Sequence, residues 1–248
     1  MNRLLIFTDA GLDDAIALQY IFTHNKIQDM VATNQLIIDI RCVSGNVGAK
    51  QVYDNVLRVI NTTPIADYEN LYVSCQPASY DDAIEPWVEG YGEDGVLGLY
   101  QDIEPAKINR PTPEIAEDES IYILVFSPFT LANKMLHTYF RQIIAIVAMG
   151  GHDSSYEGED MEFNQSLDND SFQEFVRDCD KLGVPFKLVT YEDCVKYDSL
   201  LIDVPEDIRG FYSKYQFWCD SYTSKMKELD MHTTCYDLVA AISLCKDM

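Results

Sequence analysis

A short acidic loop near the start of the chain has the composition of a cation site. Residues 8–14, TDAGLDD, place three carboxylates within six residues, on a loop that contains a glycine. Carboxylates this close repel one another unless a cation or a polyol shares their charge. Calcium accepts about six to eight oxygen ligands from carboxylates, carbonyls and water. The loop therefore predicts a hard-cation site that involves Asp9, Asp13 and Asp14.

The same acids have a structural interpretation. Asp13 and Asp14 precede the helical stretch 15–22, and acids at a helix start cap free amides and interact well with the helix dipole. Helix capping would explain one or two of the three acids. The capping and cation interpretations therefore both stay open for this loop.

The elements around the loop are those of an α/β protein. The apolar run 4–7 predicts a buried parallel strand, and it leads through the loop into a helix. Further strands are predicted at 36–43, 122–126, 143–149 and 186–190, and helices at 52–60 and at 172–182, where Gly183 is the expected cap. Alternating strands and helices predict a Rossmann-like, mostly parallel central sheet with helices on both faces.

Four polar or strand-end positions should meet at one edge of this sheet. Ligands of such sheets bind at the carboxyl ends of the strands, where Asp9, Asn46, Phe126 and Met149 are expected. Both polar and apolar members of this set also have structural explanations. Asn46 could be a turn residue after Gly45, and Met149 could be a methionine of the hydrophobic core.

The rest of the chain completes one predicted domain, residues 1–248. Residues 76–119 are rich in Pro, Gly, Asp and Glu, and so long a loop predicts a lid or binding segment, or else a tolerated surface insertion. Helices are expected near 192–201, 208–228 and 235–246.

Composition limits the partners. The formal charge of −23 disfavours nucleic acid and anionic membrane surfaces, and leaves a neutral small molecule or a cation as the natural ligand. No apolar run approaches the roughly 18 residues that span a bilayer, and the start of the chain has no signal-peptide pattern, so a cytoplasmic location is expected. Seven cysteines without CxxC spacing are expected to be reduced thiols.

Several motifs together resemble a known family. TDAGLDDA at 8–15 resembles the DTDPGxDDA signature of inosine–uridine nucleoside hydrolases. The resemblance continues in order along nearly the whole chain, through Gly45-Asn46-Val47 with Asn55, Gly92-Glu93-Asp94-Gly95, Ser127-Pro128-Phe129-Thr130, Met149-Gly150-Gly151, Glu162-Phe163-Asn164 and Tyr236-Asp237. Each motif is weak alone, and their shared order makes the signal strong.

The resemblance implies a Rossmann-like fold and hydrolysis of ribonucleosides to ribose and free base. It implies a calcium site made by Asp9, Asp14, the backbone carbonyl of Phe126 and Asp237, with Asp9 as the base that activates a calcium-bound water. The residues implied in binding the ribose are Asp13, Asn46, Met149, Glu162 and Asn164. The resemblance also implies a role in nucleoside salvage. It further implies that the protein forms a homodimer or a homotetramer.

The sequence departs from the family pattern in four places. Phe7 and Ala10 replace an aspartate and the proline of the opening motif, and residues 155–160 lack the asparagine expected near the ribose 5′-hydroxyl. The histidines expected near the leaving base are absent. Tyr91 and Tyr236 stand in their places, with Tyr236 the better candidate acid and Tyr91 a residue that covers or stacks on the base. The chain also ends 11 residues after Asp237.

Other functions remain open at this level. A protein that holds calcium and a riboside without turnover would keep the same residues, and so would a hydrolase of another N-riboside, such as a nicotinamide riboside or a modified nucleoside. Glu162 and Asn164 could instead be residues of a surface loop. Asp237 could be an acid that stabilises the start of a helix. A purely structural role has no support beyond the acidic surface.

Overall fold

The computed structural model describes residues 1–75, 88–154, 156, 158, 160–196 and 206–248. Its centre is a six-stranded sheet in the order β3-β2-β1-β4-β5-β6, and every neighbouring pair of strands is parallel. The strands are β1 (Asn2–Thr8), β2 (Leu36–Cys42), β3 (Leu71–Cys75), β4 (Ser120–Phe126), β5 (Ile143–Met149) and β6 (Phe186–Val189). This order confirms the predicted Rossmann-like class, and the point where it reverses lies between β1 and β4.

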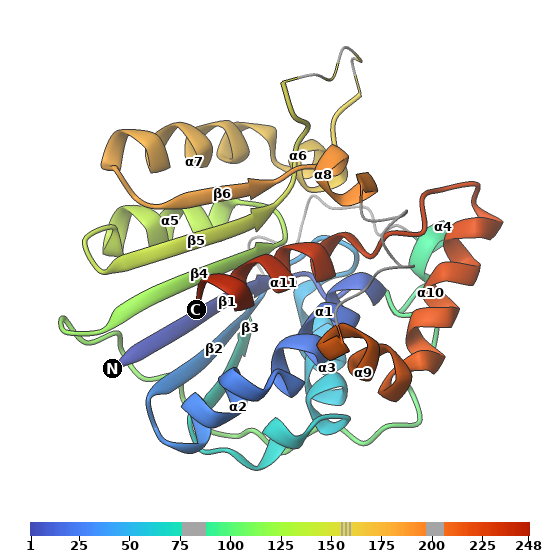
Figure 1. Ribbon diagram of the computed structural model, residues 1–248, viewed down its shortest axis with the longest axis horizontal. Coiled ribbons are helices and arrows are strands. Elements are labelled where there is room, and N and C mark those ends of the chain that lie inside the picture. The colour runs from blue at the N-terminus through green and yellow to red at the C-terminus, as the bar shows by residue number, and fades with distance from the viewer. Residues whose placement is uncertain (76–87, 155, 157, 159, 197–205) are drawn as a thin grey trace.

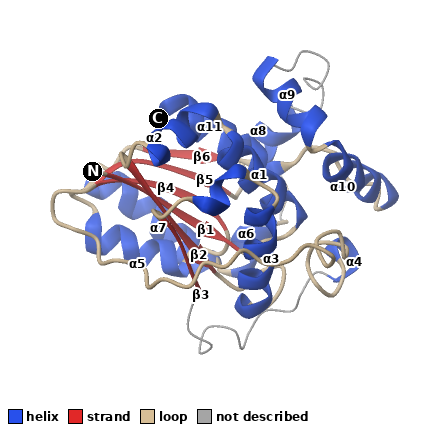
Figure 2. Ribbon diagram, turned by 90° about the horizontal axis from the view of Figure 1, so that it is seen from below, coloured by secondary structure: helices blue, strands red, loops and turns tan. Residues whose placement is uncertain are grey.

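Helices cover both faces of the sheet (Figures 1 and 2). They are α1 (Leu12–Thr23), α2 (Asn25–Ala32), α3 (Ala49–Asn61), the 3₁₀ turn η1 (Pro64–Asp67), α4 (Val88–Tyr91), α5 (Thr130–Tyr139), α6 (Phe163–Leu167), α7 (Asn169–Leu182), α8 (Tyr191–Lys196), α9 (Glu206–Lys214), α10 (Gln216–Glu228) and α11 (Tyr236–Asp247). No helix in the described ranges is long and apolar enough to cross a membrane.

Two apolar cores lie on the two faces. Along β1, Leu4 and Ile6 join the larger core with α1, α3 and α11, while Leu5 and Phe7 join the smaller core with α5 and α7. Successive side chains of a strand point to opposite faces, and here both faces are apolar, as expected for a parallel strand covered by helices.

The predicted elements differ from the structure in a few places. β3, α2 and α5 were not predicted, and the helix expected at 208–228 is divided into α9 and α10, with Tyr215 between them. The helix expected at 192–201 is α8, which begins at Tyr191, and positions 197–201 lie outside the described residues. Gly183 is the predicted cap of α7, with a left-handed φ of 66°.

The segment 76–119 is described from residue 88. Its described part includes α4 and contributes Val96, Tyr100 and Ile108 to the larger core. The lid assigned to this segment stays a prediction, and positions 76–87 lie outside the described residues.

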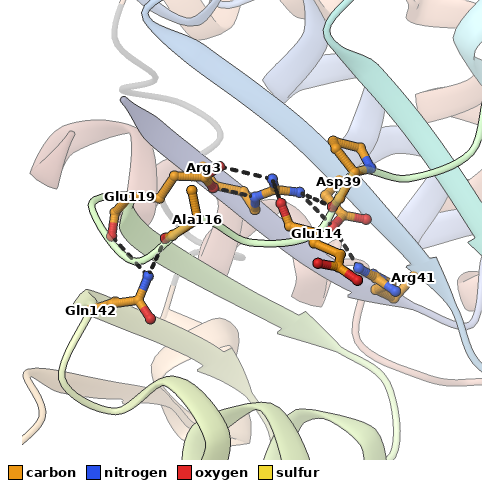
Figure 3. A network of polar contacts seen from close by, with 8 residues as sticks. Arg3, Asp39, Arg41, Glu114, Ala116, Glu119 and Gln142 are labelled. Carbon is orange, nitrogen blue, oxygen red and sulfur yellow. Dashed lines mark hydrogen bonds and ion pairs between the residues drawn. The ribbon is translucent and has the colours of Figure 1, made fainter.

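A buried ion network extends from the amino-terminal end of β1 along β2 (Figure 3). The guanidinium of Arg3, on β1, pairs with Glu119 at 2.6 Å and with Asp39 of β2 at 3.2 Å, and Arg41 pairs with Asp39 at 2.7 Å. Arg3 also donates to the backbone carbonyls of Pro113 and Glu114. Each buried acid here therefore has a cationic partner, as burial of a charge requires.

Candidate active site

A cavity of about 430 Å³ lies at the carboxyl ends of the strands. Asp9 follows β1, Asn46 follows β2, and Phe126 and Met149 are the last residues of β4 and β5. The parallel strands thus bring four predicted positions together. Every site residue predicted from the sequence lines this cavity, namely Asp9, Asp13, Asp14, Asn46, Tyr91, Phe126, Met149, Glu162, Asn164, Tyr236 and Asp237.

Asp9 is buried and held by Asn46. Its Oδ2 accepts from the Asn46 backbone amide at 2.9 Å, and its Oδ1 accepts from Asn46 Nδ2 at 3.1 Å. The loop needs Gly45, because a Cβ there would lie 1.8 Å from Asp9 Oδ2. Burial raises the pKa of Asp9 to about 7. The hydrogen bond from Asn46 opposes this rise, and the charge of Asp13 adds to it. Asp9 is therefore a fixed carboxyl group suited to exchange a proton near neutral pH.

Asp14 both caps α1 and faces the cavity. Its Oδ1 accepts from the Thr8 hydroxyl at 2.6 Å, and its Oδ2 accepts from the Gly11 amide at 3.0 Å. The capping interpretation is thus correct for Asp14. It leaves Asp13 unexplained, because Asp13 instead accepts from the Tyr91 hydroxyl at 2.8 Å.

Three of the buried acids form a group that fits a cation. Oxygens of Asp13, Asp14 and Asp237 all lie within 4.8 Å of one another. Burial raises the pKa of each of them, and the other carboxylates add to the rise for Asp14 and Asp237. None of the described residues that line the cavity is Lys or Arg. Close, buried oxygen donors without a cationic side chain fit a hard cation such as calcium. This geometry adds Asp13 to the predicted ligands, and Asp9 lies next to the group.

Glu162 and Asn164 are buried in the cavity wall, so the surface-loop alternative is wrong for both. Glu162 is the N-cap of α6, where it accepts from the amides of Asn164 and Gln165, and it also accepts from the Gly151 amide, each at 3.0 Å. Asn164 Nδ2 lies 3.7 Å from the sulfur of Met149, which belongs to the larger core as well as to the cavity wall. The loop after β5 is therefore tied to α6.

The two tyrosines have different surroundings. Tyr91 is buried and its hydroxyl is bound to Asp13. Tyr236 begins α11 and stacks on Tyr191, with 5.6 Å between the ring centroids. Burial, and next the neighbouring phenol of Tyr191, raise the pKa of Tyr236 well above its ordinary value. The Tyr236 hydroxyl is also buried without a hydrogen-bond partner among the described residues.

Part of the cavity wall was not predicted. The missed residues are His152, Tyr156, Asp160, Met161, Phe163, Tyr191, Met226 and Met231. Tyr191 follows β6 by two residues, so the carboxyl-end rule that indicated Asn46 would have indicated it as well. His152 follows Gly150-Gly151 directly after β5 and had the same signal.

Solved structures share this fold. The chain matches an inosine–guanosine nucleoside hydrolase at 21% identity and a TM-score of 0.64, over 98% of this chain and 78% of that one. It matches a purine-preferring ribonucleoside hydrolase from Gardnerella vaginalis at 18% identity and a TM-score of 0.64, over 97% and 78% of the two chains. A plant nucleoside hydrolase, PpNRh1, matches at 14% identity and a TM-score of 0.62, over 97% and 77%. At these identities the likeness establishes the fold.

A family model gives the assignment. No curated protein matches the chain. The model of the inosine-uridine preferring nucleoside hydrolases matches residues 4–247, which is nearly the entire sequence. The chain therefore belongs to the family of inosine-uridine preferring nucleoside hydrolases.

Proposed function

We propose that this protein hydrolyses the N-glycosidic bond of ribonucleosides with a water molecule that Asp9 activates. The observation that supports this most is the set of four buried carboxylates, Asp9, Asp13, Asp14 and Asp237, in a cavity that has neither Lys nor Arg among its described residues. Loss of the base leaves a sugar with oxocarbenium character, and surrounding carboxylates stabilise that positive charge.

A calcium ion is the proposed cofactor. Asp9, Asp14, Asp237 and the backbone carbonyl of Phe126 would hold it, with Asp13 close enough to join them. When bound, calcium would offset the repulsion between the carboxylates and make a coordinated water more acidic.

Asp9 then acts as the general base. Asn46 binds both oxygens of its carboxylate, which fixes the direction in which the group accepts a proton. In the calcium-free site, burial raises the pKa of Asp9 to about 7, so this carboxylate has a greater affinity for a proton than an ordinary aspartate. The water loses one proton to Asp9 as its oxygen attacks C1′ of the ribose.

The remaining polar groups bind the ribose. Asn46 Oδ1 is buried without a hydrogen-bond partner among the described residues, so it can accept from a sugar hydroxyl. Asp13, Asn164 and Glu162 supply further oxygens, while Met149 packs beneath them. Tyr236, whose hydroxyl has no hydrogen-bond partner within the described ranges, can donate a hydrogen bond to the base.

The test is an assay for reducing sugar with calcium and a panel of ribonucleosides, comparing the wild-type protein with Asp9→Asn. We expect wild-type release of ribose and a strong loss in the variant, because Asn keeps an oxygen but cannot take the proton. A wild-type protein that binds ribosides in calorimetry yet releases no sugar would be a binding protein and would overturn the proposal.

One observation favours a larger N-riboside as a second candidate substrate. The exposed apolar side chains Tyr156, Met161, Phe163 and Met231 line the cavity, and exposed apolar groups around a cleft indicate an apolar ligand group. The panel should therefore include ribosides with apolar substituents. Faster release of ribose from these than from inosine or uridine would establish the second candidate.

The finer predictions remain proposals. A cytoplasmic location, a role in nucleoside salvage and a homodimer or homotetramer are expected with the family. Size-exclusion chromatography with light scattering would test the last of these.

A further inference from the structure

His152 lies in the cavity wall, in a stack of aromatic rings. It follows Gly150-Gly151 at the carboxyl end of β5 and packs face to face on Tyr156, with 3.8 Å between ring centroids and 10° between ring planes. On another side it meets Tyr191 at 5.5 Å, and Tyr191 in turn stacks on Tyr236. A continuous series of aromatic contacts therefore connects His152 with Tyr236, the residue proposed to donate a hydrogen bond to the base.

Glu192 fixes the orientation of the imidazole. Its Oε1 lies 2.7 Å from His152 Nδ1, and its Oε2 accepts from the Asp153 amide at 2.8 Å. The backbone of α8 is bound to the same loop, because the Tyr191 amide donates to the Gly151 carbonyl at 3.0 Å. Partial burial of Glu192 opposes ionisation, yet the bonds from His152 and Asp153 leave its pKa below the ordinary value. A carboxylate on Nδ1 favours the tautomer with a proton there, and it stabilises the imidazolium, which carries a proton on Nε2 as well.

The cavity otherwise lacks a good source of a proton for a leaving base. The Tyr91 hydroxyl already donates a hydrogen bond to Asp13. Tyr236 has a strongly raised pKa, so its hydroxyl can donate a hydrogen bond but releases a proton with difficulty. His152 is the one histidine among the described residues that line the cavity. Histidine is also the side chain that gains and loses a proton near neutral pH.

We propose that His152, positioned by Glu192, is the general acid that protonates the departing base, an inference that rests on the proposed hydrolase function. As the C1′–N bond breaks, its electron pair moves to the base nitrogen, which takes the proton from His152 Nε2. The attacking water forms the new C1′–O bond and loses one proton to Asp9. Proton exchange with solvent then restores both residues, so the net reaction consumes one water. His152 touches the leaving base in this reaction, whereas Glu192 acts through His152.

Several titratable groups face His152 and enter any pH profile. Glu192 and Tyr191 approach from α8, Tyr156 from its own loop, and Glu162 from the start of α6, where burial raises the pKa of that carboxyl. The test therefore has to separate His152 from these neighbours.

The experiment compares two substrates in calcium-loaded protein. Inosine represents a leaving base that needs a proton, and p-nitrophenyl riboside has a leaving group that departs without one. We expect His152→Gln to lower kcat/KM for inosine by about 10²-fold or more and to leave p-nitrophenyl riboside within a few fold of wild type. The falling limb at high pH in the wild-type profile for inosine should be absent in the variant. Glu192→Gln should lower inosine turnover in the same substrate-selective way.

His232 provides the matched control. Its ring meets the other side of the same stack, 6.0 Å from Tyr191, but it does not line the cavity. His232→Gln should change neither substrate. Equal loss on both substrates in His152→Gln, or no loss on inosine, would overturn the role of His152 while leaving the hydrolase function in place. A wild-type protein that hydrolyses neither substrate would overturn the hydrolase function and this role with it.

Discussion

Two regions of the central sheet bury acids in opposite ways. In the network around Arg3 of β1, Asp39 and Glu119 are buried against the guanidinium, and Arg41 adds a second cation to Asp39 (Figure 3). At the carboxyl end, Asp9, Asp13, Asp14 and Asp237 line a cavity in which no described residue is Lys or Arg. The negative charge of the first cluster is balanced by arginine side chains of the same chain, whereas the carboxylates of the second cluster have no Lys or Arg beside them among the described lining residues.

The difference separates a structural cluster of acids from a functional one. A buried charge is stable when it is paired, so the Arg3 network can serve the fold without a ligand. Burial raises the pKa of all four cavity acids, and neighbouring carboxylates add to the rise for Asp9, Asp14 and Asp237, so the charged cluster destabilises the folded protein unless positive charge comes from outside. We infer that this positive charge is calcium at rest and the developing charge of the ribose during the reaction.

Breaking the balanced cluster should have the largest effect on stability. Arg3→Met leaves Asp39 and Glu119 without their main buried partner, and loss of one side of a buried pair costs about 3–5 kcal/mol in the free energy of unfolding. Urea denaturation would measure it. Arg177→Met is the control, because Arg177 is itself exposed and its partner Asp178 also pairs with Lys181, and it should leave the unfolding midpoint in place. Equal effects of the two substitutions would remove the distinction between the clusters.

One acid from each cluster should give opposite results. Asp9→Asn should reduce turnover at least about 10²-fold and should not destabilise the calcium-free protein, because it removes one of several repelling charges. Asp39→Asn should destabilise the fold and leave turnover of the folded protein unchanged. Near-native turnover in Asp9→Asn would mean that another group takes the proton.

The pH dependence of stability should reveal the unbalanced cluster. The pKa of Asp9 rises from an ordinary value near 4 to about 7 in the folded protein, so the folded state binds the proton more tightly. The resulting stability is fully present below about pH 4 and is lost as the pH rises through about 7. Melting temperatures with a chelator should fall across this range, and added calcium should reduce the fall. A chelated protein that gains stability from pH 4 to 7 would contradict the raised pKa.

The smallest expected effect concerns the contact between Tyr91 of α4 and the acids of the cavity. Tyr91→Phe removes the hydrogen bond to Asp13 and should weaken riboside binding by about 1 kcal/mol, roughly fivefold in KM, with little change in kcat. Steady-state kinetics would show it. A drop in kcat with an unchanged KM would instead place Tyr91 in the chemical step.

The sequence predicted the site better than its surroundings. Asp9, Asn46, Phe126 and Met149 were predictable because parallel strands end at a common edge, so position along the chain implies position in space. The pairing of His152 with Glu192 was not predictable, because it joins the loop after β5 to helix α8, and the two partners lie 40 residues apart in the sequence. The fold class followed from alternating strands and helices, whereas β3 was missed because it is a short edge strand with a partly exposed face.

If the acids of the cavity need an external cation, a calcium titration followed by thermal unfolding should reveal it. We expect calcium to raise the melting temperature of the chelated wild-type protein in a saturable way, because binding to the folded state stabilises it. The same titration should have little effect on Asp14→Asn, which removes a carboxylate from the group of three close acids. A wild-type melting temperature and turnover that are unchanged between exhaustive chelation and saturating calcium would contradict the account.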